Sequence, residues 1–122
     1  INKDSLLVVS KNDETPPKPI RLRAKIIKEW YHDKQYFTQG FEIHKMQDSD
    51  KLILIESTGL YGKSRMLYYD FDVEYKLKRL KIIKHAEVEK HLFGEGCTVY
   101  QDKVYQLTWI KGVINVYNIT TL

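Results

Sequence analysis

The sequence predicts an all-β fold made of repeated antiparallel sheets. A four-residue pattern occurs twice, as Phe-Thr-Gln-Gly at residues 37–40 and as Phe-Gly-Glu-Gly at residues 93–96, which places the copies 56 residues apart. Short runs of strand-forming residues, separated by turn residues, follow both copies. Units of four short strands that recur about every 50 residues are typical of the blades of a β-propeller, because each blade is one four-stranded sheet.

The chain before the first copy has two parts. Residues 1–19 include a polar, Pro-rich stretch and are predicted to be an N-terminal extension or linker. Residues 20–31 alternate apolar and basic side chains, which predicts one amphipathic strand. We expect this strand to pair as an outer strand of the first or last blade, so that residues 20–122 form the N-terminal portion of a propeller domain.

The first copy, from residue 37 to about residue 84, is predicted to form blade one. The all-aliphatic segment 52–55 is expected to be buried on both faces. A polar connection at 45–51 and a turn with two glycines at 57–63 separate the strands. The predicted strands of blade one are 41–44, 52–55, 66–71 and 75–84.

The second copy begins at residue 93 and is predicted to form an incomplete blade two, with strands at 97–100, 104–109 and 113–118. Its second strand matches the first copy at an offset of 50 residues and its third at 48, so the repeat drifts only in its turns. Gln39 and Glu95 then occupy equivalent positions of neighbouring blades, and we expect both to face one mouth of the channel. Because two blades cannot close a ring, we interpret the chain as the first part of a longer propeller.

The bulk composition limits the class of protein. A chain of 122 residues suffices for one domain, and its longest apolar runs are too short for a transmembrane span or a signal peptide. The start at Ile1 rather than Met leads us to expect a trimmed or processed chain. The net charge is +4, and the basic residues alternate with apolar ones along predicted strands. We therefore predict that they form a solvated strand face rather than a surface that binds nucleic acid or an anionic membrane.

Five motifs in order resemble the plant-type glutaminyl-peptide cyclotransferases: residues 32–33, 37–41, 56–64, 93–96 and 105–109. The resemblance implies a five-bladed β-propeller that converts an N-terminal glutamine of peptides or proteins to pyroglutamate. It also implies a secretory or extracellular protein. The family is unrelated to the zinc-dependent animal cyclases, so no cofactor is implied for catalysis, while a structural metal ion in the channel stays open.

The resemblance also assigns roles to four residues. It implies that Glu95 is the acid/base and that Phe37, Gln39 and Trp109 line the pocket for the substrate's glutamine side chain. The family's remaining site residues, a lysine, an asparagine and further tryptophans, come from later blades and match no position here. The implied partners are therefore Gln-initiated peptides and the remainder of the propeller.

The chemistry needs residues of these types. The substrate's α-amine attacks its own γ-carboxamide and ammonia leaves, so one carboxylate can take a proton from the amine and give it to the departing nitrogen. Glycines on both sides of Glu95 let the backbone bend and let a substrate come close. Aromatic walls from Phe37 and Trp109 would fold the glutamine side chain back on its amine, and Gln39 would orient it by hydrogen bonding.

Alternative interpretations remain open from the sequence alone. Glu95 could cap backbone amides, and Phe37, Gln39 and Trp109 could serve only packing. The whole protein could be a non-catalytic propeller that binds partners. Glu56 is interpreted as structural, and the four histidines show no zinc-ligand spacing.

The single cysteine excludes an internal disulfide and leaves the redox compartment undecided. Cys97 could also be considered as a nucleophile, since it lies two residues after Glu95. The neighbouring carboxylate would raise its pKa, which argues against that role.

Overall fold

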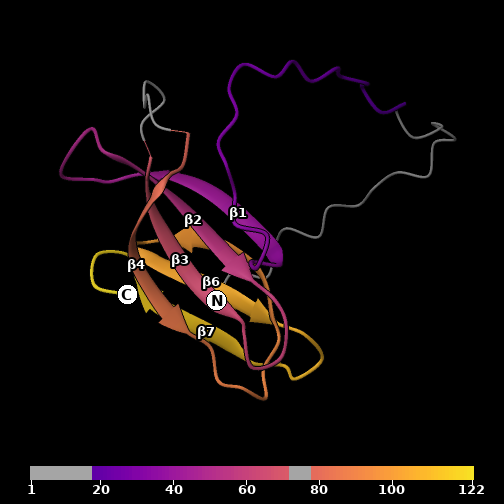
Figure 1. The fold of residues 1–122 in the computed structure, drawn as a ribbon, viewed down its shortest axis with the longest axis vertical. Helices are drawn as coiled ribbons and strands as arrows, with labels where there is room; N and C mark the ends of the chain where they lie inside the picture. The colour runs from indigo at the N-terminus through magenta and orange to yellow at the C-terminus, as the bar shows by residue number, and fades with distance from the viewer. Residues whose placement is uncertain (1–17, 72–77) are drawn as a thin grey trace, which may run out of the picture.

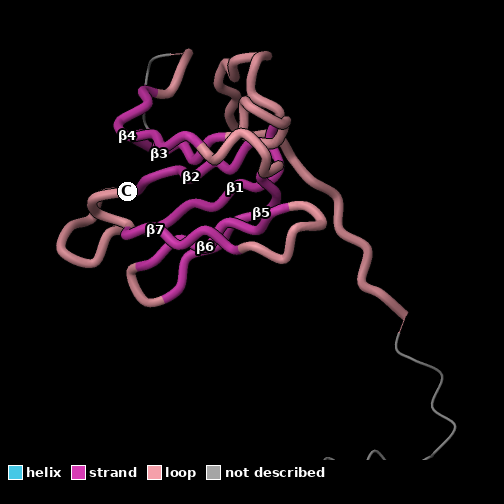
Figure 2. The backbone as a smooth tube through the Cα atoms, turned by 90° about the horizontal axis from the view of Figure 1, so that it is seen from below, coloured by secondary structure: helices cyan, strands magenta, loops and turns pink. Residues whose placement is uncertain are grey.

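A computed structural model describes residues 18–71 and 78–122, which form two stacked antiparallel sheets without a helix (Figure 1). The first sheet has the order β1-β2-β3-β4 and the second the order β5-β6-β7. Figure 2 shows the sheets as two layers, with β1 near β5. The strands are β1 (Thr38–Lys45), β2 (Leu52–Thr58), β3 (Arg65–Phe71), β4 (Lys81–Glu87), β5 (Gly94–Tyr100), β6 (Lys103–Thr108) and β7 (Ile114–Asn118).

The core lies between the two sheets. It is built from alternate residues of each strand, because successive side chains of a strand point to opposite faces. Its buried members are Ile53, Ile55, Met66, Tyr68, Val104 and Ile119. The prediction that residues 52–55 are buried on both faces is wrong: Ile53 and Ile55 are buried, whereas Leu52 and Leu54 on the other face are partly exposed.

The strand register confirms the internal repeat. The first two strands of each sheet pair as Phe41 with Glu56 and as Cys97 with Gln106, which reproduces the offsets of 56 and 50 residues. The next pairs are Leu54 with Tyr69 and Val104 with Tyr117, which reproduces the offset of 48. Two irregularities coincide as well, because the register shifts between Thr38 and Gly40 and again between Gly94 and Cys97.

The sheets stack in the same sense, so the outer face of the second sheet is left uncovered, and the outer face of the first sheet is covered only in part, by the segment 28–36. Leu107, Ile114 and Val116 lie on the free face of the second sheet and are 51–54% exposed. The positions equivalent to them in the first sheet are fully buried against the second sheet: Ser57, Met66 and Tyr68. The arrangement is consistent with two consecutive blades of a larger propeller.

The predicted strand at residues 20–31 is wrong. Residues 18–30 have no regular secondary structure, and Tyr31 makes only an isolated parallel bridge to Arg79. Alternating apolar and polar side chains show only that a segment could have an apolar face. A strand also needs an adjacent strand whose backbone can hydrogen-bond its N–H and C=O groups. Within the described residues the segment finds such an edge only at Tyr31, where its N–H donates to the Lys78 carbonyl at 2.5 Å.

Several strand ends differ from the predicted ones. β1 and β5 begin three residues earlier, so all but the first residue of each repeated motif lies inside a strand, and β2 runs on to Thr58, into the predicted turn. β4 begins at Lys81 rather than residue 75, and residues 72–77 lie outside the described part, as do residues 1–17 of the predicted extension. A two-residue hairpin turn joins β5 to β6, and its residues Gln101 and Asp102 both have positive φ. No helix in the described part could cross a membrane.

Candidate functional site

Glu95 lies in the irregular part of β5. The regular pairing of β5 with β6 is interrupted between Gly94 and Cys97, so Glu95 sits in a bulge, as Gln39 does in β1. Bulges re-aim side chains and are common next to active sites. Glu95 is half-buried, and among the described residues its carboxylate has no hydrogen-bond or ion-pair partner.

The glycines beside the two bulges allow close backbone contacts. A Cβ atom on Gly40 would lie 2.7 Å from the amide nitrogen of Cys97 and 3.0 Å from the Cα atom of Gly96. A Cβ atom on Gly94 would lie 2.4 Å from the Thr58 carbonyl oxygen. The structure therefore brings the two repeated motifs together at the contact between β1 and β5, as the repeat predicts.

Four aromatic rings form a cluster beside these motifs. Phe93 is its centre, with ring centroids 6.3 Å from Phe37, 5.5 Å from Tyr61 and 5.8 Å from Trp109. Phe37 and Trp109 are 52% and 50% exposed. Two of the three predicted substrate-binding residues thus flank the same ring and leave half of their surface open to a ligand.

Gln39 approaches the same cluster through Gly59. A Cβ atom on Gly59 would lie 2.3 Å from the Phe93 ring and 3.1 Å from Cγ of Gln39, so only a glycine fits between them. Tyr61, in the turn after β2, is not among the site residues predicted from the sequence. The signal was present, because Tyr61 lies in one of the motifs that carry the family resemblance.

The backbone after Trp109 is unusual. Ile110 has φ of 50°, a left-handed conformation that is costly for a β-branched residue. Its neighbour Trp109 donates its N–H to the Phe93 carbonyl at 2.9 Å, and Gly59 donates to the Phe37 carbonyl at 2.7 Å in the equivalent place. These bonds fix each motif to the strand beside it.

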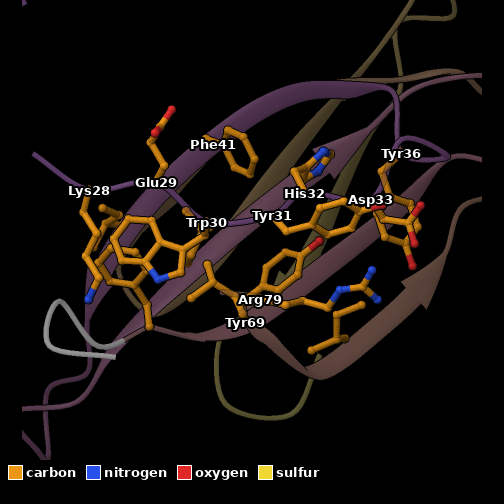
Figure 3. Close-up of a pocket in the computed structure, with 15 residues that line it drawn as sticks. Lys28, Glu29, Trp30, Tyr31, His32, Asp33, Tyr36, Phe41, Tyr69 and Arg79 are labelled. Atoms are coloured by element: carbon orange, nitrogen blue, oxygen red, sulfur yellow. The ribbon is translucent and has the colours of Figure 1, made fainter. Parts of the chain in front are cut away.

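The described residues also line a cavity of about 540 Å³ on the other face of the first sheet, under the segment 28–36 (Figure 3). None of the four predicted site residues lines it. Its floor includes Leu54 and Tyr69, whose equivalents Val104 and Tyr117 face the first sheet in the inter-sheet core. We therefore interpret this cavity as part of a surface on which another sheet packs, and not as the substrate pocket.

A buried carboxylate ties the segment 28–36 to the first sheet. Glu56 is fully buried and accepts hydrogen bonds from Thr38 Oγ1 at 2.6 Å and Tyr69 Oη at 2.6 Å, while His32 Nε2 lies 2.9 Å away. Burial and the hydrogen bond to Glu56 raise the pKa of Tyr69, which keeps its proton on the hydroxyl. Partners on several sides of Glu56 support the interpretation that it is structural.

The described part of the chain holds neither an activated thiol nor a cluster of metal-ligating side chains. Burial, followed by the Glu42 carboxylate, raises the pKa of Cys97 to about 11, so the thiol stays protonated near neutral pH. No group of three or more His, Cys, Asp or Glu side chains gathers within residues 18–71 and 78–122. A structural metal ion held with residues of other blades stays a prediction.

Comparison with known proteins shows which family this chain belongs to. Residues 4–122 match the glutamine cyclotransferase family. The chain is also similar to a glutaminyl-peptide cyclotransferase of Arabidopsis thaliana, with 30% identity over 98 residues. That match covers 80% of this chain and 27% of the plant protein. The chain therefore belongs to the glutamine cyclotransferase family.

Proposed function

We propose that the protein to which this chain belongs converts the N-terminal glutamine of peptides or proteins to pyroglutamate and releases ammonia. Family membership and the similarity to a glutaminyl-peptide cyclotransferase support this activity. The observation that carries it is the position of Glu95, in a bulge between two glycines with no partner for its carboxylate among the described residues.

In the proposed reaction, the neutral α-amine of the substrate attacks the γ-carboxamide carbon of the same residue. One C–N bond forms to close the five-membered lactam, and the bond from this carbon to the amide nitrogen breaks. Glu95 takes a proton from the attacking amine and passes it to the departing nitrogen, which leaves as ammonia. A single carboxylate balances both proton transfers.

The aromatic cluster supports a binding role for Phe37 and Trp109. Both rings pack against Phe93 and remain half exposed, so they can hold the aliphatic part of a glutamine side chain without rearranging the core. Gln39, at the bulge equivalent to that of Glu95, would hydrogen-bond the carboxamide or the amine. Holding the side chain folded over the amine is a proximity effect, the main source of acceleration for an intramolecular attack.

The rest of the proposed site lies outside this chain. We propose that it completes a five-bladed propeller, with a lysine and an asparagine of later blades stabilising the developing oxyanion. The apolar outer faces of both sheets support this proposal, because each is equivalent to a face that is buried between the sheets. A secretory location and catalysis without a metal cofactor are part of the same proposal.

The activity is tested by incubating the full-length protein with a Gln-initiated peptide and analysing the product by mass spectrometry. The proposal predicts a product lighter by one ammonia and resistant to aminopeptidase. A matched Asn-initiated peptide should react far more slowly, since its attack would close a strained four-membered ring. Folded protein that leaves the Gln-peptide intact would favour a propeller that only binds partners.

A further inference from the structure

The backbone of Glu95 is held by a side chain from the other sheet. Ser57 lies on β2 of the first sheet and donates its hydroxyl proton to the Glu95 carbonyl oxygen on β5. Ser57 is fully buried, so this bond is not shared with bulk water. The bond reaches into the bulge, where β5 and β6 do not pair regularly.

Ser57 is in turn oriented by a buried glutamine. Gln106 Nε2 donates to Ser57 Oγ at 2.8 Å, so the one hydroxyl proton of Ser57 is directed at Glu95. The Oε1 atom of Gln106 accepts from Tyr117 Oη at 3.1 Å and from Asn115 Nδ2 at 3.2 Å. These bonds fix which end of the amide faces Ser57, and the chain of donors runs in one direction toward Glu95.

The repeat shows what is particular to this arrangement. In the first sheet, Tyr69 donates to Glu56 at the positions equivalent to Tyr117 and Gln106. There the polar residue of the second strand contacts Thr38 and His32. Gln106 instead reaches across to the neighbouring sheet and, through Ser57, to the bulge that carries the proposed acid/base.

We propose that Ser57 and Gln106 are positioning residues for Glu95, an inference that rests on the proposed function. They set the peptide of Glu95 and thereby the direction in which its carboxylate leaves the bulge. Proton transfer needs hydrogen-bond reach, and a displacement of about 1 Å can cost about 100-fold in rate. Substrate binding by the aromatic cluster does not depend on these two residues, so KM should respond much less than kcat.

The test measures kcat and KM for a Gln-initiated peptide with full-length protein. Ser57→Ala should lower kcat about 10- to 100-fold with KM changed less than about 3-fold. Ser57→Thr keeps the hydroxyl and should restore kcat to within about 3-fold of wild type. Gln106→Glu keeps the shape and the acceptor for Tyr117, but its carboxylate would attract the Ser57 proton away from Glu95, so kcat should fall as for Ser57→Ala.

The matched control is Tyr69→Phe. It removes the buried hydroxyl equivalent to that of Tyr117, and among the described residues the bond from this hydroxyl to Glu56 does not lead to Glu95. A comparable loss of thermal stability with unchanged kcat in this control would show that a lost buried hydrogen bond alone does not impair the reaction. If Ser57→Ala does not fold, the same comparison of kcat and thermal stability is made between Gln106→Glu and Tyr69→Phe.

Two results separate this inference from the proposed function. Wild-type activity that is lost in Glu95→Gln but kept within about 2-fold in Ser57→Ala and Gln106→Glu would overturn the positioning role alone. Wild-type protein without cyclase activity, or activity unchanged in Glu95→Gln, would overturn the proposed function itself.

Discussion

Single glycines decide where the proposed acid/base can lie. The φ angle of Gly94 is not positive, so its backbone conformation does not require a glycine. A glycine is required because a side chain would clash with neighbouring atoms. Its missing side chain lets β5 approach the Thr58 carbonyl and the Gln106 amide, which draws the two sheets together at the bulge of Glu95. A Cβ atom on Gly96, on the other side of Glu95, would meet no atom within 4 Å.

This difference gives a matched pair of substitutions. Gly94→Ala would place a Cβ atom 2.4 Å from a backbone oxygen, and we expect it to lower the free energy of unfolding by about 1–3 kcal/mol. Gly96→Ala meets no atom within 4 Å and should change that free energy by less than about 1 kcal/mol. Urea unfolding of the two full-length variants measures both; equal losses would contradict the close approach.

The raised pKa of Cys97 predicts a pH-dependent reactivity. Only the thiolate is alkylated, so a pKa of about 11 leaves a small reactive fraction near neutral pH and a rate that grows as the pH rises toward 11. At pH 7.5 iodoacetamide should modify Cys97 about 100-fold more slowly than an unfolded peptide with the same cysteine. Rapid alkylation of the folded protein would show that the thiol is exposed or activated.

At the scale of elements, the buried carboxylate of Glu56 joins a segment without secondary structure to a sheet. Glu56→Ala would leave the buried hydroxyl of Tyr69 without its acceptor and remove the contacts of Thr38 and His32. We expect a loss of about 2–4 kcal/mol in the free energy of unfolding. Glu87→Ala, whose carboxylate is exposed and lies 3.5 Å from Arg65, should cost less than about 1 kcal/mol. Similar losses for the two would refute a structural role of Glu56.

The sequence predicts the elements well where two signals agree. Matched motifs and strand composition together locate β1 to β3 and β5 to β7, and the observed pairs reproduce the predicted offsets. For residues 20–31 the only signal is the alternation of apolar and basic side chains. This alternation does not show whether a strand is available to hydrogen-bond the segment, and the prediction of a strand is wrong.

At the candidate site, Gln39 in β1 and Glu95 in β5 lie on neighbouring strands, as the repeat predicts, while their roles stay predictions. Tyr61 was missed because its position depends on how the turn after β2 folds back over Phe93, a tertiary contact that has no local pattern. The network from Gln106 through Ser57 to Glu95 could not be predicted either, since it joins residues of both sheets.

At the scale of the whole molecule, the apolar outer faces of the two sheets are the main feature. The face of the second sheet presents Leu107, Ile114 and Val116, and the face of the first sheet carries the cavity floor with Phe41 and Leu54. Apolar faces of this kind mark sites where further structure packs. Through the repeat, the outer face of each sheet is equivalent to the face of the other sheet that is buried between them. Further sheets can therefore stack in the same direction, as the blades of a ring do.

The 122-residue chain on its own should therefore associate or bind a hydrophobic dye. Sedimentation velocity is expected to show concentration-dependent oligomers, and replacing Leu107 and Val116 by lysine should reduce them by placing charges on the free face. The full-length protein should show neither effect. An isolated chain that stays monomeric and binds no dye would contradict the interpretation of these faces as blade interfaces.

The most direct test of the account is the rate of ammonia release from a Gln-initiated dipeptide, measured for full-length wild-type protein and Glu95→Gln in the presence of a zinc chelator. Gln keeps the shape of the side chain and removes the proton acceptor, so the aromatic cluster and KM should be preserved. The account predicts activity that survives the chelator in the wild type and falls by at least about 100-fold in Glu95→Gln. Equal rates for the two proteins would contradict the assignment of proton transfer to Glu95.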